Sequence, residues 1–147
     1  MNVKQATVSI SDAEWEVMRV VWASNYMTSR EIIDTLMAIK DWKEGTIKSL
    51  LNRLIQKEAI AKDTSTTPYT YYPTISLVEA TQQRSDDLVS QTCTRDRADI
   101  IQHLIDTNEL SQDDIQNLMD SLQNKLKTAP TSVTCQCPAG QCHCHLH

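Results

Sequence analysis

Four of the five cysteines lie within the last thirteen residues of the sequence, in a spacing that suits a metal ion. They form two Cys-x-Cys pairs, Cys135 with Cys137 and Cys142 with Cys144, joined by a segment that contains Pro-Ala-Gly. In an extended chain, residues two apart point to the same side, and Pro-Ala-Gly can turn one pair back onto the other. Four thiolates converging on one point suit tetrahedral zinc, and soft sulfur ligands also suit Cu(I).

Several alternatives stay open at this end of the chain. The cysteines could form two disulfides instead, but disulfides are rare in reducing compartments and nothing in the sequence signals export. His143, His145 and His147 could add ligands, although we expect them to form a solvated basic fringe. Cys93 stands apart, and we expect it to be a small buried apolar side chain. The spacing alone does not choose between zinc and copper.

The composition favours a mostly helical protein. The 147 residues include two glycines, no phenylalanine and 5% aromatic residues, and the length suits one domain or a small domain with an accessory region. No apolar run is long enough to cross a bilayer, and the N-terminus lacks a signal-peptide pattern, so we expect a cytoplasmic protein with no membrane partner. The net charge is −5, yet residues 40–62 carry six basic against three acidic side chains, which is compatible with nucleic-acid binding.

The N-terminal half contains the helices of a compact domain. Two capping boxes, which begin at Ser11 and at Thr28, predict a first helix ending near Ala23 and a second helix after the second box. Apolar residues at helical spacing predict a third helix from about Thr46 to Glu58.

Two strand-like segments follow the third helix. Ile60–Asp63 and Tyr69–Tyr72 are joined by residues 64–68, which are typical of a hairpin loop. Three short helices and a hairpin predict a winged helix-turn-helix, in which the third helix enters the major groove of DNA and the hairpin forms the wing.

The outward side of the third helix carries residue types suited to DNA. A polar helix face is more often simply solvated, but the hairpin that follows favours a role in DNA binding. The predicted DNA-binding residues are Lys43, Thr46, Lys48, Ser49, Asn52 and Arg53 on or beside this helix, with Lys62 on the wing.

Three further helical segments are predicted after the hairpin. The first begins at Ser76, the second spans Asp96–Asp106 and the last begins at Ser111. This region is too small to fold well alone, so we expect its apolar faces to meet a second copy in a two-fold dimer; packing onto the DNA-binding domain is the alternative. The fold class is therefore mainly α: a winged-helix DNA-binding domain at residues 1–74, a helical dimerisation region at 75–128 and a cysteine-rich metal-binding tail at 129–147.

These segments resemble a known family of winged-helix proteins. Ile10–Met18 with Trp22, then Thr46–Leu54 and Tyr69–Pro73, resemble the penicillinase-repressor family. The C-x-C-x4-C-x-C tail resembles the copper-responsive branch of that family, the CopY-type repressors. The resemblance covers nearly the whole chain.

The resemblance implies a homodimer that binds an inverted-repeat operator, with TACA and TGTA halves, ahead of copper-transport genes. It implies that zinc at the four tail cysteines accompanies DNA binding. It also implies that Cu(I), delivered by a copper chaperone, displaces zinc and releases the repressor. Among the DNA contacts, the match to the family extends to Thr46, Ser49 and Arg53.

Two other functions are not excluded. The chain could be a metal-buffering or metal-delivery protein, although such a protein needs no basic recognition helix. It could also be a β-lactam-responsive repressor with incidental cysteines; the resemblance implies that this branch is switched by proteolysis, typically at an Asn-Phe bond, and the chain has no phenylalanine. The sequence contains no phosphate-binding loop, dinucleotide fingerprint, zincin motif or nucleophile elbow, so it does not predict an enzyme.

Overall fold

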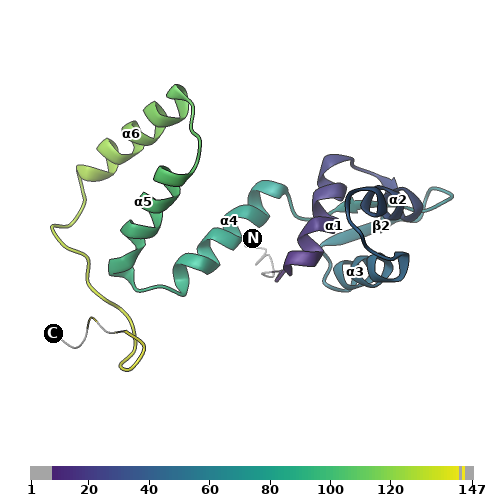
Figure 1. The fold of residues 1–147 in the computed structure, drawn as a ribbon, viewed down its shortest axis with the longest axis horizontal. Coiled ribbons are helices and arrows are strands. Elements are labelled where there is room, and N and C mark those ends of the chain that lie inside the picture. The colour runs from purple at the N-terminus through teal and green to yellow at the C-terminus, as the bar shows by residue number, and fades with distance from the viewer. Residues whose placement is uncertain (1–7, 143, 145–147) are drawn as a thin grey trace. The chain divides into compact units, whose positions relative to one another are not determined.

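The chain folds into two units in the computed structural model, which describes residues 8–142 and Cys144 (Figure 1). The first unit ends at Arg84 and the second begins at Ser85, so the boundary falls within helix α4 (Leu77–Ser90). Throughout the described part of the chain, no helix combines the length and the apolar character that a membrane span requires.

Two capped helices open the first unit, as the sequence predicts. Helix α1 (Asp12–Ala23) begins after Ser11, whose hydroxyl accepts a hydrogen bond at 3.2 Å from the N–H of the third helical residue. Helix α2 (Ser29–Ile39) begins in the same way after Thr28, again at 3.2 Å. In both helices a glutamate at the third position accepts in return from the N–H of the capping residue. The two boxes thus satisfy donors that a helix leaves unpaired at its start.

Helix α3 (Glu44–Gln56) starts and ends two residues earlier than predicted. Its end is set by Glu58, whose φ of +63° reverses the chain in the left-handed region. The N–H of Ala59 then reaches back to the carbonyl of Leu54 at 3.0 Å, which closes the last turn of the helix.

The sheet has three antiparallel strands in the order β1-β3-β2, one strand more than predicted. Strands β2 (Ile60–Asp63) and β3 (Thr70–Pro73) form the predicted hairpin, with β3 displaced by one residue. Strand β1 (Met27–Thr28) lies just before α2 and pairs with the other edge of β3. A two-residue strand has no periodicity to detect, so only its pairing reveals it.

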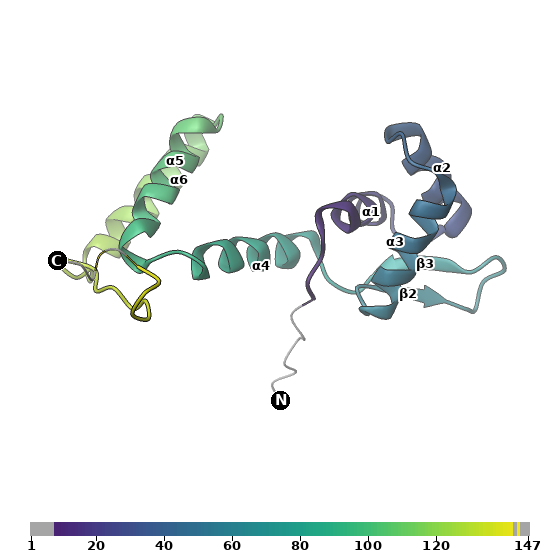
Figure 2. The ribbon, with the colours of Figure 1, turned by 60° about the horizontal axis from the view of Figure 1, so that its bottom comes forward.

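The core of the first unit lies between the three helices and the start of β2 (Figure 2). The Trp22 indole adds a hydrogen bond from Nε1 to the carbonyl of Ile75 at 2.9 Å. Because the inner side of α3 belongs to this core, its opposite side is held toward solvent. The buried cluster consists of Val17, Met18, Val20, Val21, Ile32, Ile33, Leu36, Ile47, Leu50, Leu51, Leu54, Ala59 and Ile60.

An ion pair between a buried glutamate and an exposed lysine joins α1 to the end of α3. Glu14 is 1% exposed, and its Oε1 lies 2.8 Å from Nζ of Lys57. Burial raises the pKa of Glu14, but hydrogen bonds from Lys57 and Ser11 together outweigh it and hold the pKa below its ordinary value. A carboxyl with a lowered pKa stabilises the fold above its unfolded-state pKa, and this stability is lost as the pH falls through the lowered value.

We expect Lys57→Met to lower the free energy of unfolding by about 2 kcal/mol at pH 7, because a buried carboxylate loses a hydrogen-bonded cation. The difference from wild type should shrink as the pH falls and the carboxyl becomes protonated. Urea unfolding followed by tryptophan fluorescence measures this, since all three tryptophans lie in the first unit. As a control, Lys40→Met removes only a half-exposed pair with Glu16 and should change stability by under about 0.5 kcal/mol. Equal losses in the two variants would contradict the prediction.

The second unit contains the end of α4, a 3-10 turn η1 (Thr94–Asp96), and helices α5 (Arg97–Thr107) and α6 (Gln112–Leu126). The helices predicted for this region are therefore present, with η1 where α5 was expected to begin. Among the described residues, neither α5 nor α6 buries a side chain. Instead they carry an apolar stripe, defined as seven side chains that are 41–75% exposed: Ile101, Leu104, Ile115, Leu118, Met119, Leu122 and Leu126.

Candidate metal centre and DNA-binding face

Four cysteine sulfurs meet in the second unit, and one of them comes from outside the tail. The Sγ atoms of Cys93, Cys135, Cys142 and Cys144 all lie within 4.8 Å of one another. The Sγ of Cys93 is 3.5 Å from that of Cys135 and 3.8 Å from that of Cys144, and 3.8 Å separates the sulfurs of Cys135 and Cys142. All five cysteines of the chain are thiols. We call these four residues the sulfur group.

The separations within the sulfur group fit a tetrahedral metal ion. Four sulfurs at about 2.3 Å from a central zinc ion lie about 3.8 Å from one another. Three of the six separations, at 3.5, 3.8 and 3.8 Å, are close to this value, and the other three do not exceed 4.8 Å. A donor set made only of sulfur suits zinc or Cu(I) and disfavours magnesium or calcium, which prefer oxygen. The sulfur group is therefore placed to hold one soft or borderline metal ion.

Cys137, which the sequence assigns to the metal site, is not one of the four cysteines whose sulfurs all lie within 4.8 Å of one another, although its thiol interacts with those of Cys135, Cys93 and Cys142. Its backbone N–H donates to the Sγ of Cys135 at 3.4 Å. A hydrogen bond from Cys144 lowers the pKa of the Cys135 thiol to about 6, whereas desolvation raises the pKa of Cys137 to about 12 and a hydrogen bond with Cys142 raises the pKa of Cys144. Metals bind the thiolate form, so Cys135 is the sulfur best prepared for a metal. The predicted set of four tail cysteines stays a prediction.

A tight turn brings the second Cys-x-Cys pair back toward the first, as the Pro-Ala-Gly segment predicts. The N–H of Gln141 donates to the carbonyl of Pro138 at 3.2 Å, and Gly140 has a φ of +90° that residues with a side chain rarely adopt. This turn allows Cys142 and Cys144 to reach Cys135 and Cys93, the other members of the sulfur group. The predicted roles of His143, His145 and His147 fall outside the described residues.

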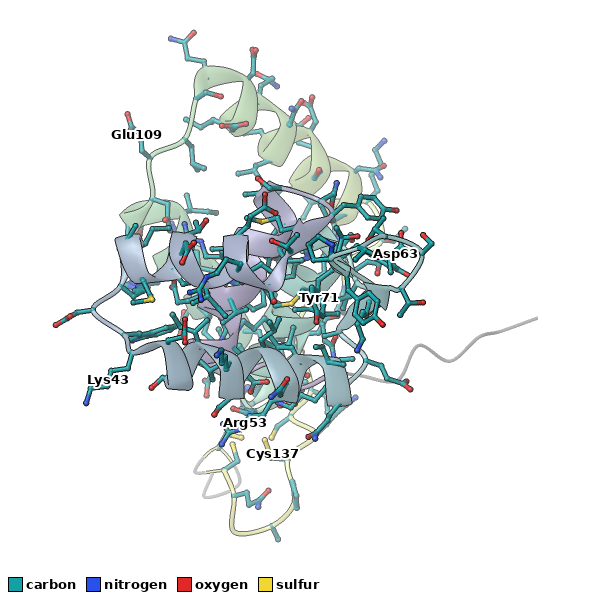
Figure 3. All side chains as sticks on the ribbon, turned by 90° about the vertical axis from the view of Figure 1, so that its right-hand side faces the viewer. Lys43, Arg53, Asp63, Tyr71, Glu109 and Cys137 are labelled. Carbon is teal, nitrogen blue, oxygen red and sulfur yellow. The ribbon has the colours of Figure 1, made fainter. Side chains whose placement is uncertain are left out.

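The predicted DNA-binding residues occupy one side of α3 and the wing. Figure 3 shows Lys43 and Arg53 projecting away from the ribbon of α3. On the wing, Nζ of Lys62 lies 5.2 Å from the centre of the Tyr69 ring, a cation–π contact that holds the amine beside the hairpin loop. All seven are exposed: Lys43, Thr46, Lys48, Ser49, Asn52, Arg53 and Lys62. Their contacts with DNA stay a prediction.

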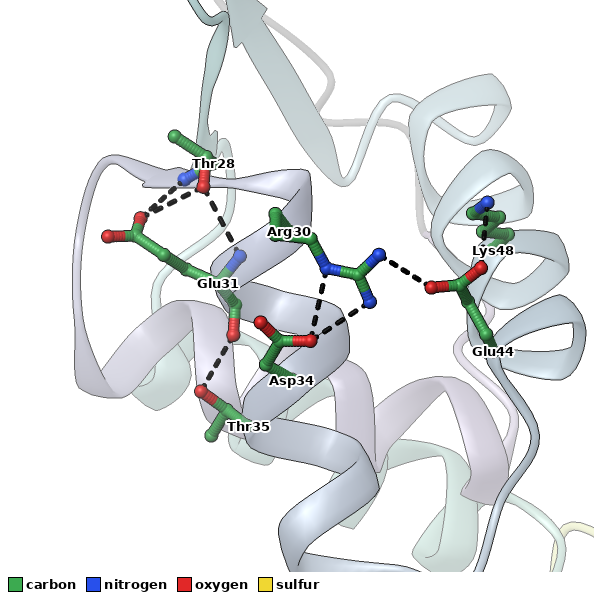
Figure 4. A network of polar contacts seen from close by, with 7 residues as sticks. All are labelled: Thr28, Arg30, Glu31, Asp34, Thr35, Glu44 and Lys48. Carbon is green, nitrogen blue, oxygen red and sulfur yellow. Dashed lines mark hydrogen bonds and ion pairs between the residues drawn. The ribbon is translucent and has the colours of Figure 1, made fainter.

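Arg30 of α2 borders this face, and sequence patterns did not reveal it (Figure 4). Its guanidinium lies 2.9 Å from Asp34 and 2.6 Å from Glu44, the first residue of α3. Glu44 also pairs with Lys48 at 3.1 Å. Hydrogen bonds from Arg30 and Lys48 lower the pKa of Glu44, so its carboxylate is charged at neutral pH. The spacing of Arg30 and Asp34 indicates a pair within α2, but nothing in the sequence indicates the bond to α3.

The cations among the predicted DNA-binding residues differ in whether a carboxylate pairs with them. Lys48 is offset by Glu44. Within residues 8–142 and Cys144, the structure records no ion pair for Lys43, Arg53 or Lys62. The latter three are therefore the cations best placed to meet a phosphate backbone.

Known proteins similar to this chain were identified by sequence and by structure. Residues 10–124 match the penicillinase repressor family. A protein of Latilactobacillus sakei, called an uncharacterized 16.5 kDa protein in the ptsI 3′ region, is 36% identical over 138 residues, which cover 94% of each chain. The methicillin resistance regulatory protein MecI of Staphylococcus aureus is 29% identical over 119 residues, 81% of this chain and 97% of MecI. The solution structure of the DNA-binding domain of the repressor BlaI has 34% identity and a TM-score of 0.46, and the match covers 50% of this chain and 90% of that one.

Proposed function

The chain belongs to the penicillinase-repressor family, and on this basis we propose that it is a copper-responsive transcriptional repressor. Its zinc-loaded homodimer binds an inverted-repeat operator ahead of copper-transport genes, and Cu(I) supplied by a copper chaperone releases it by displacing zinc. The observation that carries the metal response is the sulfur group, four thiols within 4.8 Å of one another.

The partial exposure of the sulfur group supports a site in which one metal ion can replace another. Cys135, Cys142 and Cys144 are only half-buried, so an incoming ion can reach them. Bound zinc supplies a tetrahedral link among four thiolates. Cu(I) also favours thiolates, but two or three suffice for it, so an exchange changes which cysteines are held together. That difference is what a switch requires, because a ligand shifts a conformational equilibrium only through differential interactions with the two states.

The first unit supports the DNA-binding role. Ile47 and Leu54 anchor the inner side of α3 in the core with no exposed surface, which fixes the rotation of the helix. The outer side then offers hydroxyl groups at Thr46 and Ser49 and a guanidinium at Arg53, types that hydrogen-bond base edges and phosphates. In a winged helix the third helix is the one that enters the major groove.

The apolar stripe of α5 and α6 supports self-association. Its side chains follow helical spacing and stay exposed in one chain, and exposed apolar surface marks an interaction site when it is extensive. A second copy of the same stripe would cover it around a two-fold axis. A two-fold dimer carries two winged helices, which matches the two halves of an inverted repeat.

Operator affinity measured with each metal tests the proposal. With a labelled duplex carrying the TACA/TGTA inverted repeat, we expect the zinc-loaded protein to bind about 5–150-fold more tightly than the Cu(I)-loaded protein, the usual range of allosteric coupling. Fluorescence anisotropy under anaerobic conditions provides the measurement. A chain that ends at Ala129 lacks the four tail cysteines, and its affinity should not depend on the metal. Equal affinity of the intact protein with zinc and with Cu(I) would rule out the copper response.

A β-lactam-responsive repressor is the second candidate, because MecI is among the relatives. Its cysteines would be incidental, so replacing Cys142 and Cys144 with serine would leave metal dependence unchanged. The lack of phenylalanine speaks against a proteolytic switch at an Asn-Phe bond.

A further inference from the structure

Cys93 lies far from the tail in sequence and close to it in space. It is 8% exposed at the end of the segment that follows α4, and it does not belong to the buried apolar cluster of the first unit. Its nearest recorded partners are sulfurs, Cys135 at 3.5 Å and Cys144 at 3.8 Å. A cysteine that served only as a small apolar side chain would be surrounded by carbon atoms. The sulfur neighbours of Cys93 instead indicate that it is a ligand of the metal ion.

The backbone around Cys93 holds the tail in place. The hydroxyl of Thr94 donates to the carbonyl of Thr134 at 2.6 Å, directly before the first tail cysteine. A cavity of about 350 Å³ lies between the two segments, lined by residues 90–94 and Arg97 on one side and by residues 136–138 and Gln141 on the other.

Arg97 adds a positive charge beside this cavity. Its Nε is buried and has no hydrogen-bond partner among the described residues. Four thiolates around a divalent ion carry a net charge of about −2, and a guanidinium nearby offsets part of it. Groups that surround metal ligands in this way tune metal affinity.

We propose that the zinc ligands are Cys93, Cys135, Cys142 and Cys144, so that the metal ties the tail to the turn between α4 and α5, with Cys137 outside this set. The proposal rests on the metal response argued above and names the ligands of that same site. Residues 93–144 then form a closed loop that contains both α5 and α6. Because these two helices carry the apolar stripe, metal occupancy constrains the surface through which two copies meet. This connects the metal to the spacing of the two DNA-binding units.

Cobalt(II) substitution in the full-length reduced protein distinguishes the two possible ligand sets, because each thiolate bound to cobalt adds sulfur-to-metal charge-transfer absorption. We expect Cys93→Ser to lose about one quarter of this absorption and Cys137→Ser to keep it, since only the first removes one of four ligands. Zinc affinity, measured by competition with a chromophoric chelator, should fall by at least about 10-fold in Cys93→Ser alone. Equal far-ultraviolet circular dichroism of the two variants without metal checks their folding.

Limited proteolysis provides a second measurement that does not depend on ligand counting. Trypsin cuts after Lys125, in the last turn of α6, and after Lys127, which directly follows the helix. Zinc should slow cleavage there in the wild type and in Cys137→Ser but not in Cys93→Ser, because only the bond to Cys93 closes the loop.

Three outcomes overturn the proposal, and they are distinguishable. Full absorption in Cys93→Ser with a loss in Cys137→Ser would return the site to the four tail cysteines and leave the repressor function intact. Equal losses in both variants would show that the ligands are not the four named. No cobalt–thiolate absorption in the wild type would remove both this proposal and the metal response.

Discussion

The double variant Leu118→Asp, Leu122→Asp is expected to be monomeric and to bind the inverted-repeat operator about 10²–10⁴-fold more weakly than the wild type. Both leucines belong to the apolar stripe on α6, and two aspartates would place charges in the interface that we propose between two copies. When one module of a dimer is bound, the other meets its half-site at a high effective concentration, an advantage of about 10²–10⁴ that a monomer lacks. Native mass spectrometry and operator anisotropy measure the two effects.

The chain offers a matched control for this experiment. Asn117→Asp with Asn124→Asp adds the same charge to the polar side of α6, where both residues are exposed, and this variant should stay dimeric. Because the leucines are exposed within one chain, their replacement should leave the helical content unchanged. A double-leucine variant that remains dimeric would show that the apolar stripe is not the dimer interface.

Arg53→Ala is expected to weaken binding of the zinc-loaded protein to the operator by at least about 30-fold. Arg53 is exposed on α3, and the structure records no ion pair for it among the described residues. A good arginine contact with a base contributes about 1–3 kcal/mol, and a dimer loses two such contacts. A loss of about 2 kcal/mol corresponds to roughly 30-fold in affinity. Zinc content should not change, because the sulfur group lies in the other unit.

Arg19→Ala is the control for charge, since it removes one exposed cation from α1 whose partner is Glu16 at 3.7 Å. Its operator affinity should stay within about twofold of wild type. Unchanged affinity in Arg53→Ala would contradict the assignment of α3 as the recognition helix. A wild-type protein that binds zinc but shows no preference for the operator over a scrambled duplex would instead indicate a metal-buffering role.

The helices and the hairpin could be predicted because their determinants are local. The capping boxes at Ser11 and Thr28 place a donor and an acceptor three residues apart, so the sequence contains the complete interaction. The spacing of apolar residues predicts α3, and two β-branched or aromatic segments around a loop predict the hairpin. The end of α3 was predicted less well, because Glu58 adopts a left-handed conformation for which glycine is the usual indicator. The three-part division of the chain at residues 74 and 128 stays a prediction.

The candidate site could be predicted only in part. The Cys-x-Cys pairs and the turn between them indicate thiolates that converge, since both features lie within ten residues. Cys93 could not be assigned in this way, because a single cysteine 42 residues from its partner has no spacing to interpret. The sequence therefore predicts a small buried apolar side chain there; Cys93 is indeed buried, and the structure places it among sulfurs.

The sequence by itself determined which segments are helical, which form the wing, and which residue types could bind DNA or metal. Only the tertiary structure decided that Glu14 is buried against Lys57, that Arg30 reaches Glu44, and that Cys93 meets the tail. The physical reason is the range of the interactions. Hydrogen bonds and apolar periods within a helix or hairpin are set by neighbours along the chain, whereas contacts between distant residues depend on how the elements pack, and packing is a property of the whole fold.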